Sequence, residues 1–279
     1  MKSFLKRYCR NYGAMIGLIV LLAVVVVSFV APMLYEESPW MMVAEPLMKP
    51  FADMAYPFGT DMLGRDITAG LLYGARVSLL VGVISTAVAL VVGVLVGSVA
   101  GYCGGRIDDA LMRVTEFFQT IPQLAMAVVI VAIFNPSIYS IVGAISVVSW
   151  PPVARLVRGE FLSLKQREFV QAAIVIGQRP LRIILTQILP NAMSPIIVSA
   201  SFMVATAILT EAALSFLGLG DRNMMSWGFM IGAARTMIRE AWWMSVWPGV
   251  AILLTVLAIN LIGEGLNDAL NPQLRRRGE

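Results

Sequence analysis

Six long hydrophobic stretches decide what this chain can fold into. A helix needs about 20 mostly apolar residues to cross roughly 30 Å of hydrocarbon. Because 58% of the chain is hydrophobic and only 14% is charged, with a mean hydropathy of +0.80, an ordinary soluble domain is excluded. The sequence therefore predicts an all-α membrane protein with six transmembrane helices, at residues 12–34, 77–101, 110–134, 138–155, 194–217 and 246–267.

The positive charges predict how these spans are oriented. If the N-terminus is cytoplasmic, fifteen of the 21 lysine and arginine residues fall on inside segments and six on outside segments. The positive-inside rule then places both termini and the 156–193 loop in the cytoplasm. This topology accounts for the net charge of +4, which is no evidence for nucleic-acid binding. We expect an N-terminal span plus external segment (1–76), a five-helix core (77–267) and a cytoplasmic tail (268–279).

Several kinds of chemistry have no residues to support them here. The chain has no histidine, no CxxC pair around Cys9 or Cys103, and no GxxxxGK[ST] phosphate-binding loop. Histidine is the commonest metal ligand and general base, and a phosphate-binding loop is the usual sign of a nucleotide site. We expect no catalytic, cofactor-binding or metal-binding residues in this chain. If ATP drives the protein, another chain must bind it.

The polar loop at 156–193 has the pattern of two short helices joined by a turn. Phe169, Ala172, Ala173 and Ile176 recur at spacings of three and four, which predicts one small apolar face for insertion into a partner's groove. Gly177 suits a left-handed helix end and Pro180 the first turn of the next helix, with a bend expected where prolines 190 and 195 return the chain to the membrane. The residues alone leave an alternative open, in which arginines 179 and 182 hold the element on anionic lipid.

A second polar block lies in the external segment between the first two spans. Thr60 or Asp61 is expected to cap a helix, and Asp61, Arg65 and Asp66 to form a charge network at its start. The block either stabilises a surface helix or contacts substrate directly. Its members are Gly59, Thr60, Asp61, Leu63, Gly64, Arg65 and Asp66.

Ionisable residues inside the spans need protein or water around them, because a lone charge in a bilayer costs several kcal/mol. Glu211 in the fifth span is either a pathway residue or a partner in an interhelical hydrogen bond. We expect Arg113 and Glu116 of the third span to form an ion pair. Glycines 93, 97 and 101 predict a close-packing face on the second span, and tryptophans 242, 243 and 247 suggest anchoring at the membrane interface.

Four motifs resemble those of bacterial ABC importer permeases, in particular the second permease subunit of the peptide and nickel branch. The cytoplasmic loop is similar to the EAA loop of these permeases, and the external block resembles their GTDxLGRD signature. LSFLGLG at 214–220 with SWG at 226–228, and LNPQLR at 270–275, resemble two further elements. The chain departs from the family at Gln171, Gln187 and Asn271, and at residues 221–225, where prolines are usual. The loop residues that match or replace the EAA pattern are Gln171, Ala172, Ala173, Gly177, Leu189 and Pro190.

The resemblance implies a type I importer permease in the bacterial inner membrane that forms half of a translocation pathway for dipeptides or oligopeptides. It further implies a homologous permease subunit, two ATPase subunits or domains that hold ATP and Mg, and an external substrate-binding protein, with the loop residues coupling to the ATPases. Nickel-chelate, opine, glutathione and oligosaccharide importers share the pattern. From other classes, an ion-coupled secondary transporter or channel is the main alternative, and a membrane enzyme lacks a visible catalytic cluster.

Overall fold

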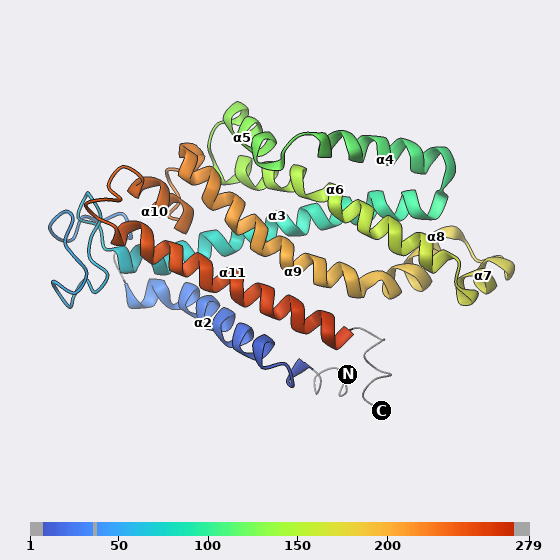
Figure 1. The fold of residues 1–279 in the computed structure, drawn as a ribbon, viewed down its shortest axis with the longest axis horizontal. Helices are drawn as coiled ribbons and strands as arrows, with labels where there is room; N and C mark the ends of the chain where they lie inside the picture. Colours follow the sequence, from blue (N-terminus) through green and yellow to red (C-terminus); the bar gives the residue numbers. More distant parts are fainter. Residues whose placement is uncertain (1–7, 36–37, 271–279) are drawn as a thin grey trace.

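A computed structural model describes residues 8–35 and 38–270 as an elongated bundle of helices (Figure 1). Backbone β pairing in these ranges is limited to two isolated β-bridges, at Met42–Arg65 and Thr60–Asp66. The elements are α2 (Tyr12–Leu34), α3 (Ile67–Cys103), α4 (Gly105–Thr120), α5 (Gln123–Phe134), α6 (Ile138–Lys165), α7 (Glu168–Val175), α8 (Pro180–Ile183), the π-helical turn η1 (Ile184–Ile188), α9 (Leu189–Leu214), a second π-helical turn η2 (Ser215–Leu219), α10 (Trp227–Ala234) and α11 (Trp243–Leu270).

Five of the predicted spans are helices long and apolar enough to cross a membrane, but the third is not one helix. The prediction of a single span at 110–134 is wrong, because α4 and α5 meet at an angle of 85° and form a sixth span only as a bent pair. The break falls at Ile121, which is extended (φ −94°, ψ 132°). Pro122 follows it, and proline disfavours helical backbone in the residue before it.

The helices of the bundle extend beyond the hydrophobic stretches. Helix α3 begins ten residues before position 77 because the Asp66 carboxylate caps it, accepting hydrogen bonds from the backbone N–H groups of Thr68 (2.8 Å) and Ala69 (3.2 Å). The expected division at 76/77 thus lies inside α3. Helix α6 continues to Lys165. Of the predicted tail, residues 271–279 lie outside the described residues.

The bend expected at prolines 190 and 195 is replaced by a local widening of a continuous helical path from Pro180 to Leu219. In η1 the N–H of Leu189 donates to the carbonyl of Ile184, five residues back. Pro190 directly follows Leu189, and because proline has no N–H, one bond of the helical ladder is missing there. A π-turn accommodates the register change without ending the helix.

Close packing of α3 on α6 forms the centre of the bundle, and the predicted glycine face is confirmed. A Cβ atom added to Gly93 would lie 2.5 Å from Cβ of Val153, and one on Gly97 would lie 2.4 Å from the carbonyl oxygen of Ala154. Gly101 is equally tight against Phe161. The glycines therefore set the distance between the two helices.

The two ends of the bundle carry different structures (Figure 1). At one end, called the α7 end, lie α7, α8 and the turn between α3 and α4. The first residues of α2 and the last of α11 point toward the same end. At the other, called the α10 end, lie α10 and the irregular segment 38–66.

Candidate functional site

The α7–α8 loop is anchored to the bundle by one face of α7. Val170 is fully buried and Ala173 is 4% exposed. Both belong to an apolar cluster with Phe161 of α6 and with Ile183 and Ile188 of the α8–η1 segment. Helix α7 is therefore packed on α6 and on the first turns of the helical path from Pro180 to Leu219.

The opposite face of α7 and the following turn are apolar and open. Phe169 is 42% exposed, Val175 86% and Ile176 77%, and Ala172 is also exposed. The predicted face is thus correct for Phe169, Ala172 and Ile176 but wrong for Ala173. Ala173 lies three residues from Val170, so it shares the inward side of the helix.

The turn after α7 is held by a glycine in the left-handed region. Gly177 has φ +80°, its N–H donates to the carbonyl of Ile174 (2.9 Å), and the next N–H, of Gln178, donates to the carbonyl of Ala173 (3.1 Å). This pair of bonds is the Schellman motif, so the expected role of Gly177 as a helix terminator is confirmed. Pro180 opens α8, also as predicted.

The remaining residues of the EAA-like loop lie within α7 and at the start of α9. The Nε2 atom of Gln171 donates to the carbonyl oxygen of Lys165 at 2.8 Å, at the C-terminal end of α6. Leu189 is half-buried beside η1 and Pro190 is exposed. Some residues of this loop therefore make contacts within the chain, and others are exposed.

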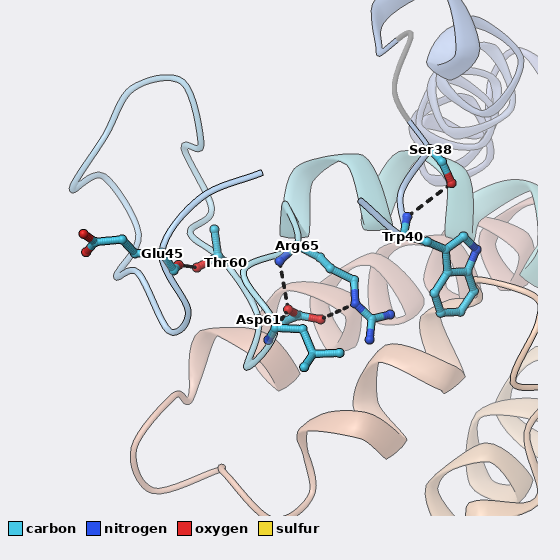
Figure 2. Close-up of polar contacts among 7 residues, drawn as sticks. Ser38, Trp40, Glu45, Thr60, Asp61 and Arg65 are labelled. Atoms are coloured by element: carbon cyan, nitrogen blue, oxygen red, sulfur yellow. Dashed lines mark hydrogen bonds and ion pairs between the residues drawn. The ribbon is translucent and has the colours of Figure 1, made fainter. Parts of the chain in front are cut away.

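The external block builds a compact irregular segment at the α10 end. Thr60 is fully buried. Its Oγ1 donates to the carbonyl of Glu45 (2.6 Å) and accepts from the N–H of Met48 (2.9 Å), which ties two stretches of the loop together (Figure 2). Gly59 and Gly64 have positive φ, and a Cβ on Gly64 would lie 2.1 Å from the carbonyl of Ala44.

Charged members of this block have separate roles. Asp61 accepts hydrogen bonds from the backbone N–H groups of Leu63 (2.8 Å) and Arg65 (2.9 Å). Its carboxylate also pairs with the guanidinium of Arg65 at 3.3 Å, and this guanidinium lies over the ring of Trp40 (Figure 2). The predicted helix cap is wrong, because Asp66 and neither Thr60 nor Asp61 caps α3. Burial raises the pKa of Asp66, and its hydrogen bonds oppose the rise.

Glu211 lies in a buried polar network that joins α9, η2 and α10. Its Oε1 atom accepts hydrogen bonds from the hydroxyls of Ser215 (2.9 Å) and Ser226 (2.8 Å). The carboxylate packs directly on the backbone of Gly228, where an added Cβ atom would lie only 2.7 Å from Oε1. The Ser226 hydroxyl also caps α10 by accepting from the N–H of Phe229 (2.9 Å). The geometry matches the interhelical hydrogen bond, the second of the two roles considered for Glu211.

The sequence placed Ser226 in the SWG motif but assigned it no individual role. A serine directly before an apolar run is an N-cap signal that could have found its capping role. Its contact with Glu211, fifteen residues away, carries no local signal.

Two expectations about side chains in the spans are corrected. The expected Arg113–Glu116 pair is not among the ion pairs of the described ranges. Arg158 of α6 instead pairs with Asp108 of α4, its Nε and Nη2 atoms donating to the two carboxylate oxygens, Nη2 at 2.6 Å. Trp243 is not an interface anchor. It is 3% exposed, and its indole N–H donates to the carbonyl of Thr60 at 3.1 Å.

The fold agrees with that of solved transporter subunits. A chain of the MetNI methionine ABC transporter in an inward-facing conformation superposes with a TM-score of 0.62 at 17% identity, covering 72% of this chain and 96% of that one. A chain from an amino acid ABC transporter with histidines gives 0.56 at 13% identity, covering 72% and 94%. The chain therefore has the all-helical fold of these ABC transporter chains.

The sequence comparisons identify the family. Residues 93–276 match the family described as binding-protein-dependent transport system inner membrane component, and residues 1–50 match the N-terminal TM domain of oligopeptide transport permease C. The chain therefore belongs to the family of binding-protein-dependent transport system inner membrane components, which are multi-pass permeases.

Three relatives match nearly the whole chain. The di/tripeptide transport system permease protein DppC of Pseudomonas aeruginosa is 39% identical, over 99% of this chain and 93% of the relative. The dipeptide permease DppC of Bacillus subtilis is 40% identical over 97% and 85%. The oligopeptide permease OppC of Haemophilus influenzae is 38% identical over 97% and 88%.

Proposed function

We propose that this chain is one of two permease subunits of an ATP-driven importer for dipeptides or oligopeptides. The peptide-permease names of relatives at 38–40% identity over 97% or more of the chain support this cargo. The partners are a homologous permease, two ATPase subunits or domains and an external substrate-binding protein. ATP and Mg bind to the ATPases, and this chain performs no covalent chemistry.

The observation that carries the proposal is the two-faced α7. One face is fixed in the bundle through Val170 and Ala173, and Val175 and Ile176 are open to the surroundings. Helix α7 itself lies at the end of the bundle (Figure 1). An exposed apolar surface on a helix that is packed against the bundle is typical of a protein-binding site. Because α7 is packed on the first turns of the helical path from Pro180 to Leu219, a closing ATPase that displaces α7 would also displace this span.

The charge distribution supports an orientation with the α7 end in the cytoplasm. The charges at this end follow the positive-inside rule. Within or directly beside the helix ends there lie Arg106, Lys165, Arg167, Arg179 and Arg182. The α10 end then faces the external binding protein.

Helix α4 offers the surface for the second permease. Asp109, Arg113 and Glu116 are exposed along it, and charged side chains are too costly to face lipid. A homologous partner that covers α4 and α5 would enclose them beside a shared aqueous path. This arrangement accounts for the charged side chains that α4 exposes.

Reconstitution into proteoliposomes tests the proposal. With the partner permease, the ATPases and the external binding protein, uptake of a labelled dipeptide is expected to require ATP and to survive ionophores that collapse proton and sodium gradients. The chain alone should neither hydrolyse ATP nor transport. Gradient-driven uptake by this chain without an ATPase would instead establish a secondary transporter.

A further inference from the structure

A polar cavity lies between η2 and α10 at the α10 end of the bundle. It has a volume of about 130 Å³ and is lined by Ser215, Gly218, Gly220, Arg222, Gly232 and Arg235, among others. The cavity has room for a small polar group, because a single water needs only about 10–15 Å³ of such space. The LSFLGLG motif and the 221–225 departure from the family pattern meet here.

Two arginines give this cavity its charge. Arg235 reaches across η2, where its Nη1 donates to the carbonyl of Phe216 at 3.3 Å, and it passes close to Gly218, which has φ +86°. The Arg222 guanidinium makes no hydrogen bond or ion pair within the described part of the chain. Both side chains are exposed, so most of their donors are available to a ligand.

Within the described ranges, the carboxylates of Asp221 and Glu211 form no ion pair with these arginines. Asp221 accepts from the backbone N–H groups of Ile138 (2.9 Å) and Asn223 (2.9 Å). Glu211 lies behind Ser215, bonded to two hydroxyls. Neither acid lines the cavity. A planar oxyanion fits such a site best, because guanidinium groups bind carboxylates with paired, charge-assisted hydrogen bonds.

We propose that this cavity binds the C-terminal carboxylate of a peptide as it enters the translocation path. This inference rests on the proposed function and on its orientation. Peptides differ in every side chain, but each unmodified peptide ends in a carboxylate. A site for that group lets one permease guide cargo of many sequences without reading side chains.

The test compares two labelled forms of one peptide, trialanine with a free carboxyl and trialanine C-terminal amide. Uptake is measured at low peptide concentration in proteoliposomes containing the whole importer and is normalised to assembled complex. The binding protein also discriminates between the two forms, but its contribution is the same for every permease variant. The informative quantity is therefore the change in the acid-to-amide ratio between permeases.

Replacing both arginines (Arg222→Gln with Arg235→Gln) is expected to lower the acid-to-amide uptake ratio about tenfold, from the loss of charge-assisted hydrogen bonds. Arg239→Gln, an exposed arginine that does not line the cavity, should leave the ratio unchanged. If the double variant does not assemble, Arg222→Gln alone removes no contact within the described chain and should lower the ratio by about threefold, part of the same effect.

An equal fall in uptake of acid and amide would overturn the inference and point to an acidic side chain of the binding protein or to anionic lipid. An unchanged ratio in a well-assembled variant would overturn it too. Both results leave the proposed function intact. Failure of the unaltered complex to take up either peptide with ATP would instead contradict the proposed function, and the inference with it.

Discussion

Gly97 is the residue where α3 and α6 approach most closely along their glycine face. A Cβ there would lie 2.4 Å from the carbonyl oxygen of Ala154 and 2.8 Å from Cβ of Val157. Gly159, on α6 itself, has no atom within 4 Å of such a Cβ. The same substitution at the two positions therefore separates packing from helix propensity.

Gly97→Ala is expected to lower the stability of the detergent-solubilised protein by about 1–3 kcal/mol, because the backbones must move apart. Gly159→Ala should be neutral or stabilising by up to about 1 kcal/mol, because alanine favours helix. Thermal unfolding followed by circular dichroism measures both. Equal midpoints for the two variants would show that the α3–α6 distance is not limited by Gly97.

Gln171 shows that a departure from a family pattern can have a local physical reason. Its side-chain N–H donates to the carbonyl of Lys165 at 2.8 Å, one of the last carbonyls of α6, which have no partner within the helix. An ionised glutamate has no donor for this bond. The amide thus fastens the start of the α7–α8 loop to the helix before it.

At the scale of elements, α7 places two neighbouring alanines on opposite faces. Ala172 is exposed and Ala173 is packed in the apolar cluster around Val170. Ala172 is part of the proposed contact with the ATPase, whereas Ala173 holds the α7–α8 loop against the bundle. Substitutions at the two sites should therefore fail in different ways.

Ala172→Arg is expected to abolish peptide-stimulated ATPase activity of the reconstituted importer while the thermal stability of the permease stays within about 0.5 kcal/mol of the unaltered chain. Ala173→Arg should itself lower stability, because it forces a charge into a buried cluster. Normal coupling in the Ala172→Arg protein would exclude this face of α7 as the docking surface.

At the scale of the whole molecule, orientation is the property most open to a direct test. Single cysteines are introduced by Ser163→Cys near α7 and by Glu45→Cys or Asn223→Cys at the α10 end, all exposed positions. The background lacks the exposed thiols of Cys9 and Cys103. Positions 45 and 223 should react with an impermeant thiol reagent in intact cells with a permeable outer envelope, and position 163 only after the membrane is opened. Labelling of position 163 from outside would reverse the topology.

The sequence by itself determined the properties that depend on composition and on short-range backbone preferences. Apolar length predicted the membrane class and five of the six spans, since crossing a bilayer sets a minimum number of residues. Gly177 and Pro180 predicted the turn after α7, because their backbone restrictions act locally. The glycine spacing of α3 predicted a close-packing face, but it did not predict that α6 packs on it.

Only the tertiary structure decided which side chains meet. The bonds from Ser226 to Glu211 and from Trp243 to Thr60 join residues 15 and 183 positions apart, and no local pattern encodes such contacts. The same holds for Ala173, whose helical spacing fits either face of α7 until Val170 and Phe161 select the inner one. Periodicity establishes that a helix has faces, whereas the packing of neighbouring helices determines which face is buried.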